Sequence, residues 1–254
     1  VHFENDFPVF GNEGKIPATF ETVSTRPGYE YTPLLQSDDF KATAGLSKEE
    51  QARLYGSFGF KSVWQFNHEP DLSLVKHDDA KGFVEITTGK ICANVSQAKN
   101  TLTQRMMYPG CMGEVTVDVS NLQEGDYAGL CALQGYYGFV GVTKREGKNY
   151  LVMVNRETPY GERMGYVRDT EPGQEWEAIP LEDHKVRLKI TADFTDMKDE
   201  AQFYYYDFKA EEYRQIGKTH KLYFNLDHFT GCRFGLFAYS TKVTGGSAKF
   251  TNFV

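Results

Sequence analysis

The sequence has no long apolar run and no excess of positive charge. No stretch approaches the roughly 20 apolar residues that a membrane-spanning helix needs, and Val1–Asp6 has neither the basic start nor the apolar stretch of a signal peptide. With 28 Lys and Arg against 35 Asp and Glu, the formal net charge is −7 and the sequence pI is about 5.5. These absences argue against a membrane protein and against nucleic acid or anionic lipid as partners, whereas binding to a neutral polymer is unaffected by the charge.

The usual catalytic and metal-binding motifs are also missing. The chain has no Gly-rich loop that opens a helix, no His-x-x-x-His or Cys-x-x-Cys spacing and no Gly-x-Ser-x-Gly turn. A glycosidase needs two carboxyl groups about 5 to 10 Å apart. With 35 acidic residues some such pair must occur by chance, so a pair alone proves nothing about catalysis.

Cysteine is sparse and does not indicate a compartment. The four cysteines, which would allow two disulfides, are Cys92, Cys111, Cys131 and Cys232. Cys131 lies in the apolar run Ala128–Leu133, and Cys232 precedes the mostly apolar run Arg233–Phe237. We therefore expect both to be buried free thiols that pack as small hydrophobic residues.

Strand patterns fill most of the chain. Short segments rich in β-branched and aromatic residues, several of them alternating in polarity, are separated by Gly, Asn and Asp. They include Glu114–Val119, Phe139–Val142, Tyr150–Val154, Val186–Ile190 and Gln202–Tyr206. Many short strands at fairly regular spacing predict a β-sandwich or barrel. One segment differs, because Ser47 followed by Glu50 is a capping-box pattern that predicts a single short helix over Leu46–Leu54.

Three blocks of sequence point to a family. They are Trp64–Asp71, Asn100–Arg105 and Gly125–Leu130, in that order. Together they resemble the C-terminal β-sandwich module of glycoside hydrolase family 43 β-xylosidases and arabinofuranosidases, a module also classed as carbohydrate-binding module family 91. The resemblance implies an all-β, concanavalin-A-like jelly-roll sandwich over residues 37–254. The ending Ala248–Phe253 is similar to the closing strand of that family.

Residues 1–36 are different in kind. The segments Phe7–Pro17 and Arg26–Pro33 are turn-rich, and proline supplies no backbone donor, so a surface tail or linker is one interpretation. The resemblance suggests another: the catalytic propeller of the family ends in a similar segment, with Trp where this chain has Phe7. We expect residues 1–36 to be the tail of that propeller or a linker. A long insertion, Ala44–Phe60, departs from the family pattern and could alter docking.

Sugar-binding sites combine flat rings with amide, acid and guanidinium groups. On the resemblance we select six candidate binding residues: Trp64, Asn67, His68, Gln104, Arg105 and Phe229. Phe229 is included because a late loop of the family carries an aromatic side chain to the rim of the propeller's active site.

Structural roles are open alternatives for the candidate binding residues. Trp64 fits the core as well as a sugar platform, Asn67 and Asp71 fit turn caps, and Phe229 fits an anchor for its own loop. Arg105 fits a bracing ion pair with Asp126. The polar group as a whole could face a ligand or a partner domain.

The resemblance implies a non-catalytic accessory module of an enzyme that degrades xylan or arabinoxylan. Its expected partners are xylan-type oligosaccharides and the family 43 catalytic propeller, with a secreted or periplasmic bacterial location favoured. A purely structural docking domain without sugar affinity is the alternative, and an autonomous glycosidase is a third. No cofactor is expected, although related jelly rolls often hold a structural calcium ion, for which Asp38, Asp39 and Asp193 are candidate ligands.

Overall fold

The computed structural model describes residues 1–11, 15, 26, 28, 33–41, 47, 60–157, 171–222 and 231–254. The chain divides into two units, Val1–Thr32 and Pro33–Val254. In the first unit, β1 (His2–Glu4) and β2 (Phe7–Val9) form a hairpin with His2 opposite Val9. Asn5 and Asp6 at its turn both have positive φ, a conformation that these two residue types tolerate well.

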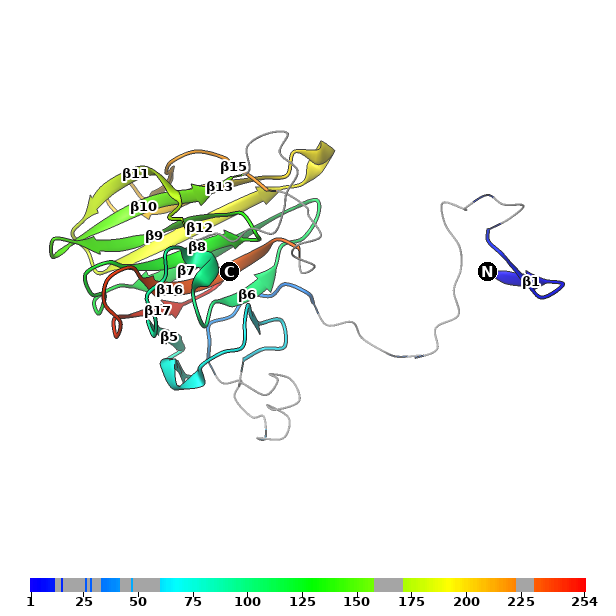
Figure 1. Cartoon of the computed structure of the whole chain (residues 1–254), viewed down its shortest axis with the longest axis horizontal. Coiled ribbons are helices and arrows are strands. Elements are labelled where there is room, and N and C mark those ends of the chain that lie inside the picture. Colours follow the sequence, from blue (N-terminus) through cyan, green and yellow to red (C-terminus); the bar gives the residue numbers. More distant parts are fainter. Residues whose placement is uncertain are drawn as a thin grey trace. The chain divides into compact units, whose positions relative to one another are not determined.

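The second unit is a sandwich of two antiparallel sheets (Figure 1). One sheet follows the order β11-β10-β9-β8-β16-β6-β3. Its strands are β3 (Gln65–Phe66), β6 (Leu102–Arg105), β8 (Asp126–Leu133), β9 (Tyr137–Arg145), β10 (Lys148–Arg156), β11 (Gln174–Leu181) and β16 (Arg233–Ser240).

The other sheet follows the order β14-β13-β12-β7-β17-β5-β4, with β15 also paired to β13. Its strands are β4 (Val75–Asp78), β5 (Phe83–Thr87), β7 (Gly110–Asp118), β12 (Lys185–Asp193), β13 (Glu200–Asp207), β14 (Glu212–Gln215), β15 (His220–Lys221) and β17 (Ser247–Thr251). Three short 3₁₀ turns complete the described elements: η1 (Leu72–Leu74), η2 (Val95–Gln97) and η3 (Thr195–Met197). All of the strand pairs among these described elements are antiparallel.

The main core lies between the two sheets. Alternate residues of a strand point to one face, so Val115 and Val117 of β7 meet Leu130 of β8 and Leu236 of β16 from the opposite sheet. All four are fully buried, and a buried side chain of this size contributes roughly 1.5–3 kcal/mol. This core therefore accounts for the alternating pattern seen in the sequence.

A second apolar cluster covers the outer face of the seven-stranded sheet. Phe139, Phe237 and Tyr239 belong to it, and Cys92 and Val95 from the segment around η2 pack against them. The sheet is consequently buried on both faces along β8, β9 and β16, which explains why these strands read as nearly continuous apolar runs.

The ends of the sandwich meet. The backbone N–H of Asp38 donates to Phe253 O at 2.8 Å, and Phe253 N–H donates to Asp38 O at 2.9 Å. Val254 and Glu114 exchange a similar pair of backbone bonds. Residues near the start of the second unit are therefore fixed by the last residues of the chain.

The jelly-roll sandwich and its strands are as the sequence predicts. Four predicted segments fall within β9, β10, β12 and β13, and the fifth, Glu114–Val119, lies in β7 except for Val119, which follows its end. The two units separate between Thr32 and Pro33, and Gln36 is bonded to Gln104 of β6. The expected boundary at residue 36 stays a prediction. The predicted helix Leu46–Leu54 and most of the insertion lie outside the described residues.

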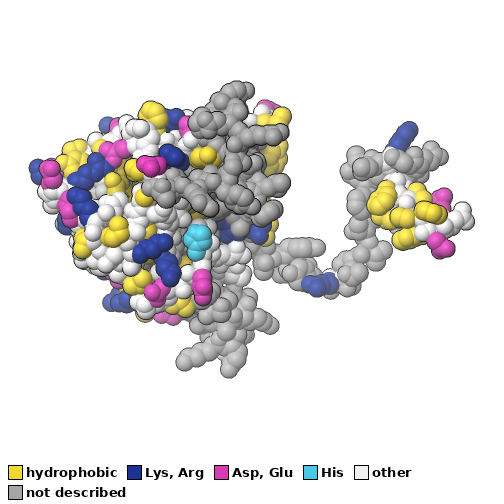
Figure 2. Space-filling view, in the orientation of Figure 1, with side chains coloured by type: hydrophobic (Ala, Val, Ile, Leu, Met, Phe, Trp, Pro, Cys, Tyr) yellow, Lys and Arg dark blue, Asp and Glu magenta, His cyan; other side chains and the backbone are white. Residues whose placement is uncertain are grey.

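Three further observations concern the thiols, the charged surface and the helices. All four cysteines are free, with Cys131 and Cys232 buried as predicted. Lys, Arg, Asp and Glu side chains are interspersed over the described part of the sandwich face in Figure 2. None of the described residues belongs to a helix long and apolar enough to cross a membrane.

Candidate functional site

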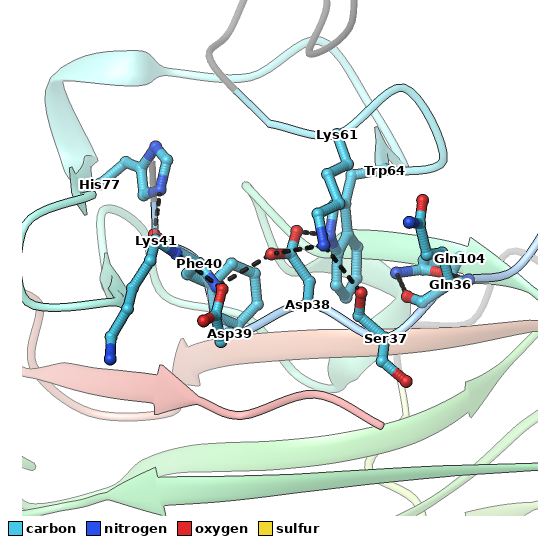
Figure 3. Close-up of polar contacts among 10 residues, drawn as sticks. All are labelled: Gln36, Ser37, Asp38, Asp39, Phe40, Lys41, Lys61, Trp64, His77 and Gln104. Carbon is cyan, nitrogen blue, oxygen red and sulfur yellow. Dashed lines mark hydrogen bonds and ion pairs between the residues drawn. The ribbon is translucent and has the colours of Figure 1, made fainter. Parts of the chain in front are cut away.

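Trp64 is a core residue. Its side chain is only 7% exposed, and its ring packs edge-on against Phe253 with centroids 4.9 Å apart. Its indole N–H donates to Asp38 Oδ2 at 2.9 Å, and Lys61 Nζ lies 3.4 Å from Asp38 Oδ1 (Figure 3). The sequence left core and platform open; the structure places the ring where no sugar can stack on it.

Gln104 also has an internal role. Its side chain is fully buried and bonds to the backbone of Gln36 twice: Gln36 N–H donates to Gln104 Oε1, and Gln104 Nε2 donates to Gln36 O, both at 2.9 Å (Figure 3). The side-chain amide of Gln104 thus forms with the Gln36 backbone the kind of hydrogen-bond pair that a neighbouring strand would form. Both bonds would have to break before Gln104 could contact a ligand.

Asn67 and His68 lie on the turn after β3. The backbone N–H of Asn67 donates to Thr101 O at 2.9 Å, which fixes this turn against the start of β6. His68 is exposed, and its Nε2 lies 3.4 Å from Ser96 O. Asp71 caps η1 by accepting from Ser73 N–H at 3.1 Å, as the turn-cap alternative predicts. His68 is therefore open to a ligand, while Asp71 is structural.

The predicted ion pair between Arg105 and Asp126 is wrong. Arg105 lies opposite Arg233, whereas Asp126 lies opposite Ser240, seven residues further along β16 and therefore roughly 23 Å away. Asp126 is buried and its Oδ2 accepts from Gln123 N–H at 2.7 Å. Burial raises the pKa of the Asp126 carboxyl group above its usual value. The two residues stand at opposite ends of their strands, which the order of the sequence blocks did not reveal.

Arg105 and Arg233, here called the arginine pair, are direct neighbours across β6 and β16. Arg105 is exposed, whereas Arg233 is only 6% exposed. Arg233 Nη1 donates to Gln65 Oε1 at 2.8 Å and to Thr103 Oγ1 at 3.1 Å, so these four residues share the outer face of the sheet. Arg233 Nε has no hydrogen-bond partner among the described residues.

A hollow of about 430 Å³ opens beside Arg105, at the end of the sandwich where the chain crosses from β6 to β7. Its described lining is largely apolar and comes from four segments of the chain: Leu34, Arg105, Met106, Met107, Tyr108, Phe194, Asp199, Gly231 and Cys232. The Tyr108 ring is 74% exposed at this place. Asp199 is the one acid among these described lining residues, so they hold no pair of carboxylates for glycoside hydrolysis. Phe229 lies outside the described residues, two positions before Gly231.

Comparison with protein families decides what this sandwich is. Residues 59–254 match the model of the β-xylosidase C-terminal concanavalin A-like domain. The chain belongs to this family. The match excludes residues 1–58, so it covers the sandwich without the anchoring segment around Asp38. No protein of curated function matches the chain.

Solved structures of family 43 proteins share the fold. A bifunctional GH43-CE protein of Bacteroides eggerthii is 36% identical, with a TM-score of 0.78 over 99% of this chain and 29% of that protein. An engineered GH43 glycoside hydrolase, described as displaying endo-xylanase and exo-arabinofuranosidase activity, is 26% identical, with a TM-score of 0.73 over 90% of this chain and 42% of that one. BlXynB of Bacillus licheniformis shows the fold at 20% identity and a TM-score of 0.65, over 90% of this chain and 40% of that one. The chain thus spans less than half of each relative.

Arg233 is not among the six candidate binding residues that the sequence suggests. The one available signal was a charged residue at the head of an otherwise apolar strand, Arg233–Ser240. Its pairing with Arg105 depends on a register between segments that are 128 positions apart, and no local pattern encodes that register.

The three candidate calcium ligands already have hydrogen-bond partners, and Asp39 accepts from Lys41 N–H at 3.1 Å. Asp38 accepts from Trp64 and Phe40 N–H, and Asp193 accepts from Thr195 and Lys198. Within the described ranges, no group of three or more His, Cys, Asp or Glu side chains could hold a metal ion. Calcium binding at these residues stays a prediction.

A second polar cluster, here called the His220 cluster, joins the two sheets near β11 and β15. Glu157 Oε2 accepts from Lys218 Nζ at 2.8 Å, while its Oε1 accepts from Asn155 Nδ2 at 2.9 Å and lies 3.4 Å from His220 Nδ1. Asn155 Oδ1 accepts from the indole N–H of Trp176 at 2.7 Å, and Lys218 Nζ lies 4.3 Å from the Trp176 ring. These bonds hold Glu157 ionised and fix the one tryptophan that is exposed, at 49%.

Proposed function

We propose that this chain is a non-catalytic accessory module of a family 43 glycoside hydrolase that acts on xylan or arabinoxylan. In this role the sandwich binds saccharide weakly at the hollow beside Arg105 and packs against the catalytic propeller. Membership of the β-xylosidase C-terminal domain family supports the accessory role. The xylan and arabinoxylan assignment draws on the activities described for the engineered relative.

The observation that carries the saccharide-binding proposal is the makeup of the hollow. An exposed ring, Tyr108, stands beside a guanidinium, Arg105, in a space whose volume lies in the range of small-molecule sites. Rings stack on the C–H faces of sugars, and guanidinium groups donate to hydroxyls. The hollow is open to solvent and holds one exposed ring. We therefore expect a net binding free energy of only about 4–6 kcal/mol in favour of the complex.

Calorimetry with neutral xylo-oligosaccharides tests this function. We expect dissociation constants from high micromolar to millimolar for the native chain. Tyr108→Ala should weaken binding about three- to tenfold, since it removes a stacking contact of roughly 0.5–1.5 kcal/mol. Phe208→Ala, which removes another exposed ring between β13 and β14, is the matched control and should leave the affinity unchanged. Submicromolar affinity, or equal loss in both variants, would contradict binding at the hollow.

A docking domain without sugar affinity is the second candidate. Trp64 and Gln104 are used inside the sandwich, and Leu34, Met106 and Met107 give the hollow an apolar wall that suits a protein surface. No heat at millimolar xylo-oligosaccharide, from a chain that melts cooperatively, would select this function over the first.

The non-catalytic part of the proposal has its own test. We expect no hydrolysis of nitrophenyl xyloside or arabinoside by this chain, because the described lining of the hollow lacks the second carboxyl group that the reaction requires. The measurement is release of nitrophenol after repeated purification. Turnover that persists through purification and disappears when Asp199 is changed to Asn would establish an active site here.

A further inference from the structure

The arginine pair is an unusual arrangement of charge. Residues directly opposite each other on antiparallel strands have Cβ atoms about 4.5–5.5 Å apart, and like charges at such positions are destabilising. Neither Arg105 nor Arg233 forms an ion pair with an acidic side chain of the described part of the chain. Within the described part of the chain, two cations thus stand side by side without a counter-ion.

Burial makes the arrangement costlier. Arg233 is almost fully buried. Among the residues that the structure describes, its Nη1 contacts the neutral acceptors Gln65 and Thr103, and its Nε has no partner. Burial lowers the pKa of the Arg233 guanidinium from its usual value, and the charge of Arg105 lowers it further. A buried cation without a counter-ion is strongly unfavourable, so an anion placed here would offset much of the strain.

The chemistry of the pair selects the kind of anion. A guanidinium presents parallel N–H donors that match the two oxygens of a carboxylate, and Arg105 gives such a group access from solvent. The chain as a whole carries a net charge of −7, which repels a polymer with an anion at every unit. An isolated carboxylate on an otherwise neutral polymer matches the guanidinium donors and avoids most of the repulsion by the net negative charge. Arg105 also lines the hollow, so a neutral part of the same ligand could lie there.

We propose that the arginine pair binds the carboxylate of a uronic acid side group on an otherwise neutral, xylan-type polysaccharide. The inference rests on the proposed saccharide-binding function and adds to it a preference for acidic substitution. Arg105 meets the carboxylate from solvent, and Arg233 stands beside it with Gln65 and Thr103 fixing its guanidinium.

The test compares a xylo-oligosaccharide that carries one glucuronic acid group with a neutral xylo-oligosaccharide of equal length, on the full chain. At low salt we expect the acidic ligand to bind at least about tenfold more tightly. The preference should shrink as salt is raised, because exposed charges are screened over about 10 Å at 0.1 M. Arg105→Gln should abolish the preference: the affinity for the acidic ligand should fall to that for the neutral ligand, so that the ratio of the two dissociation constants approaches one, whatever the loss of neutral binding at the hollow.

Three further variants make the result specific. Arg105→Lys keeps the charge but loses the paired donors, so it should retain only part of the preference. Arg214→Gln removes an arginine of β14, in the other sheet, and should change nothing. Arg233→Gln should also abolish the preference; a melt checks that it folds, and the Arg105 variants decide the matter if it does not.

The outcomes separate the two proposals. Equal affinity for acidic and neutral ligands overturns the inference and leaves the accessory binding function standing. No heat from either ligand overturns both. If a small dicarboxylate such as glutarate binds in an Arg105-dependent way and neither oligosaccharide does, the pair receives an acidic protein side chain, and the uronic acid proposal fails.

Discussion

Replacing Trp64 with alanine is expected to lower the free energy of unfolding by about 3–5 kcal/mol. The ring is buried between Phe40 and Phe253, so its removal leaves a cavity at the point where the two ends of the sandwich meet. The variant also removes the donor from Asp38 Oδ2, and Lys61 then remains as the neighbouring cation. Denaturant unfolding of the native and variant chains measures the loss, with unchanged slopes confirming a stability effect.

Trp176→Ala is the matched control. Its ring is half exposed, and its indole N–H makes one hydrogen bond to Asn155, so we expect a loss of only about 1 kcal/mol. Trp64→Phe separates the two contributions to the larger effect, because it keeps most of the ring and removes only the N–H. A Trp64→Ala chain that unfolds like the native protein and loses saccharide affinity would restore the sugar-platform interpretation.

Acidification is expected to destabilise the sandwich through the His220 cluster. The bond with His220 and those with Lys218 and Lys221 N–H lower the pKa of Glu157 to about 2. Because the unfolded carboxyl group takes up its proton near pH 4.5, the stabilisation from Glu157 is complete above that pH and is lost as the pH falls toward about 2. Burial lowers the pKa of His220, so below about pH 6.5 the unfolded chain binds a proton that the folded chain resists. Both effects act in the same direction.

The lowered pKa of Glu157 predicts a fall in the free energy of unfolding on the order of 1–2 kcal/mol between pH 7 and pH 3, allowing for the partial exposure of Glu157, and His220 adds to this fall. Unfolding curves at several pH values measure it. Glu157→Gln should flatten the curve below pH 4.5 and make the protein less stable at pH 7. Glu182→Gln, at an exposed position before β12, should leave the curve as it was. An acid limb of the same slope in both variants would show that other carboxylates dominate.

The sequence predicts the fold well because strand patterns are local. Alternation in segments such as Glu114–Val119 depends on neighbouring residues only, and β7 and its partners appear where that pattern places them. The family blocks likewise mark short stretches of chain. Strand alternation and the family blocks can each be recognised within about ten residues. Neither requires knowing which strands pair.

The roles of the candidate residues depend on pairing and were harder to predict. Trp64 bonds to Asp38, 26 positions away, and Gln104 bonds to Gln36, 68 positions away. Both side chains were predicted to bind a ligand, and both instead make contacts inside the sandwich. Arg233 reaches Gln65 across 168 positions, and no pattern near Arg233 indicates this partner. His68 and Arg105 keep the exposure that a ligand needs, and Phe229 remains a prediction.

During synthesis Asp38 is added long before Phe253, the residue with which it exchanges two backbone hydrogen bonds. At about 5–20 residues per second the interval is roughly 10 to 40 seconds. Until Phe253 is added, Trp64 lacks the ring that packs edge-on against it in the finished sandwich, although β5 to β13 precede Phe253 in the chain. The face of the Trp64 ring that Phe253 covers therefore stays open in the growing chain until Phe253 is added.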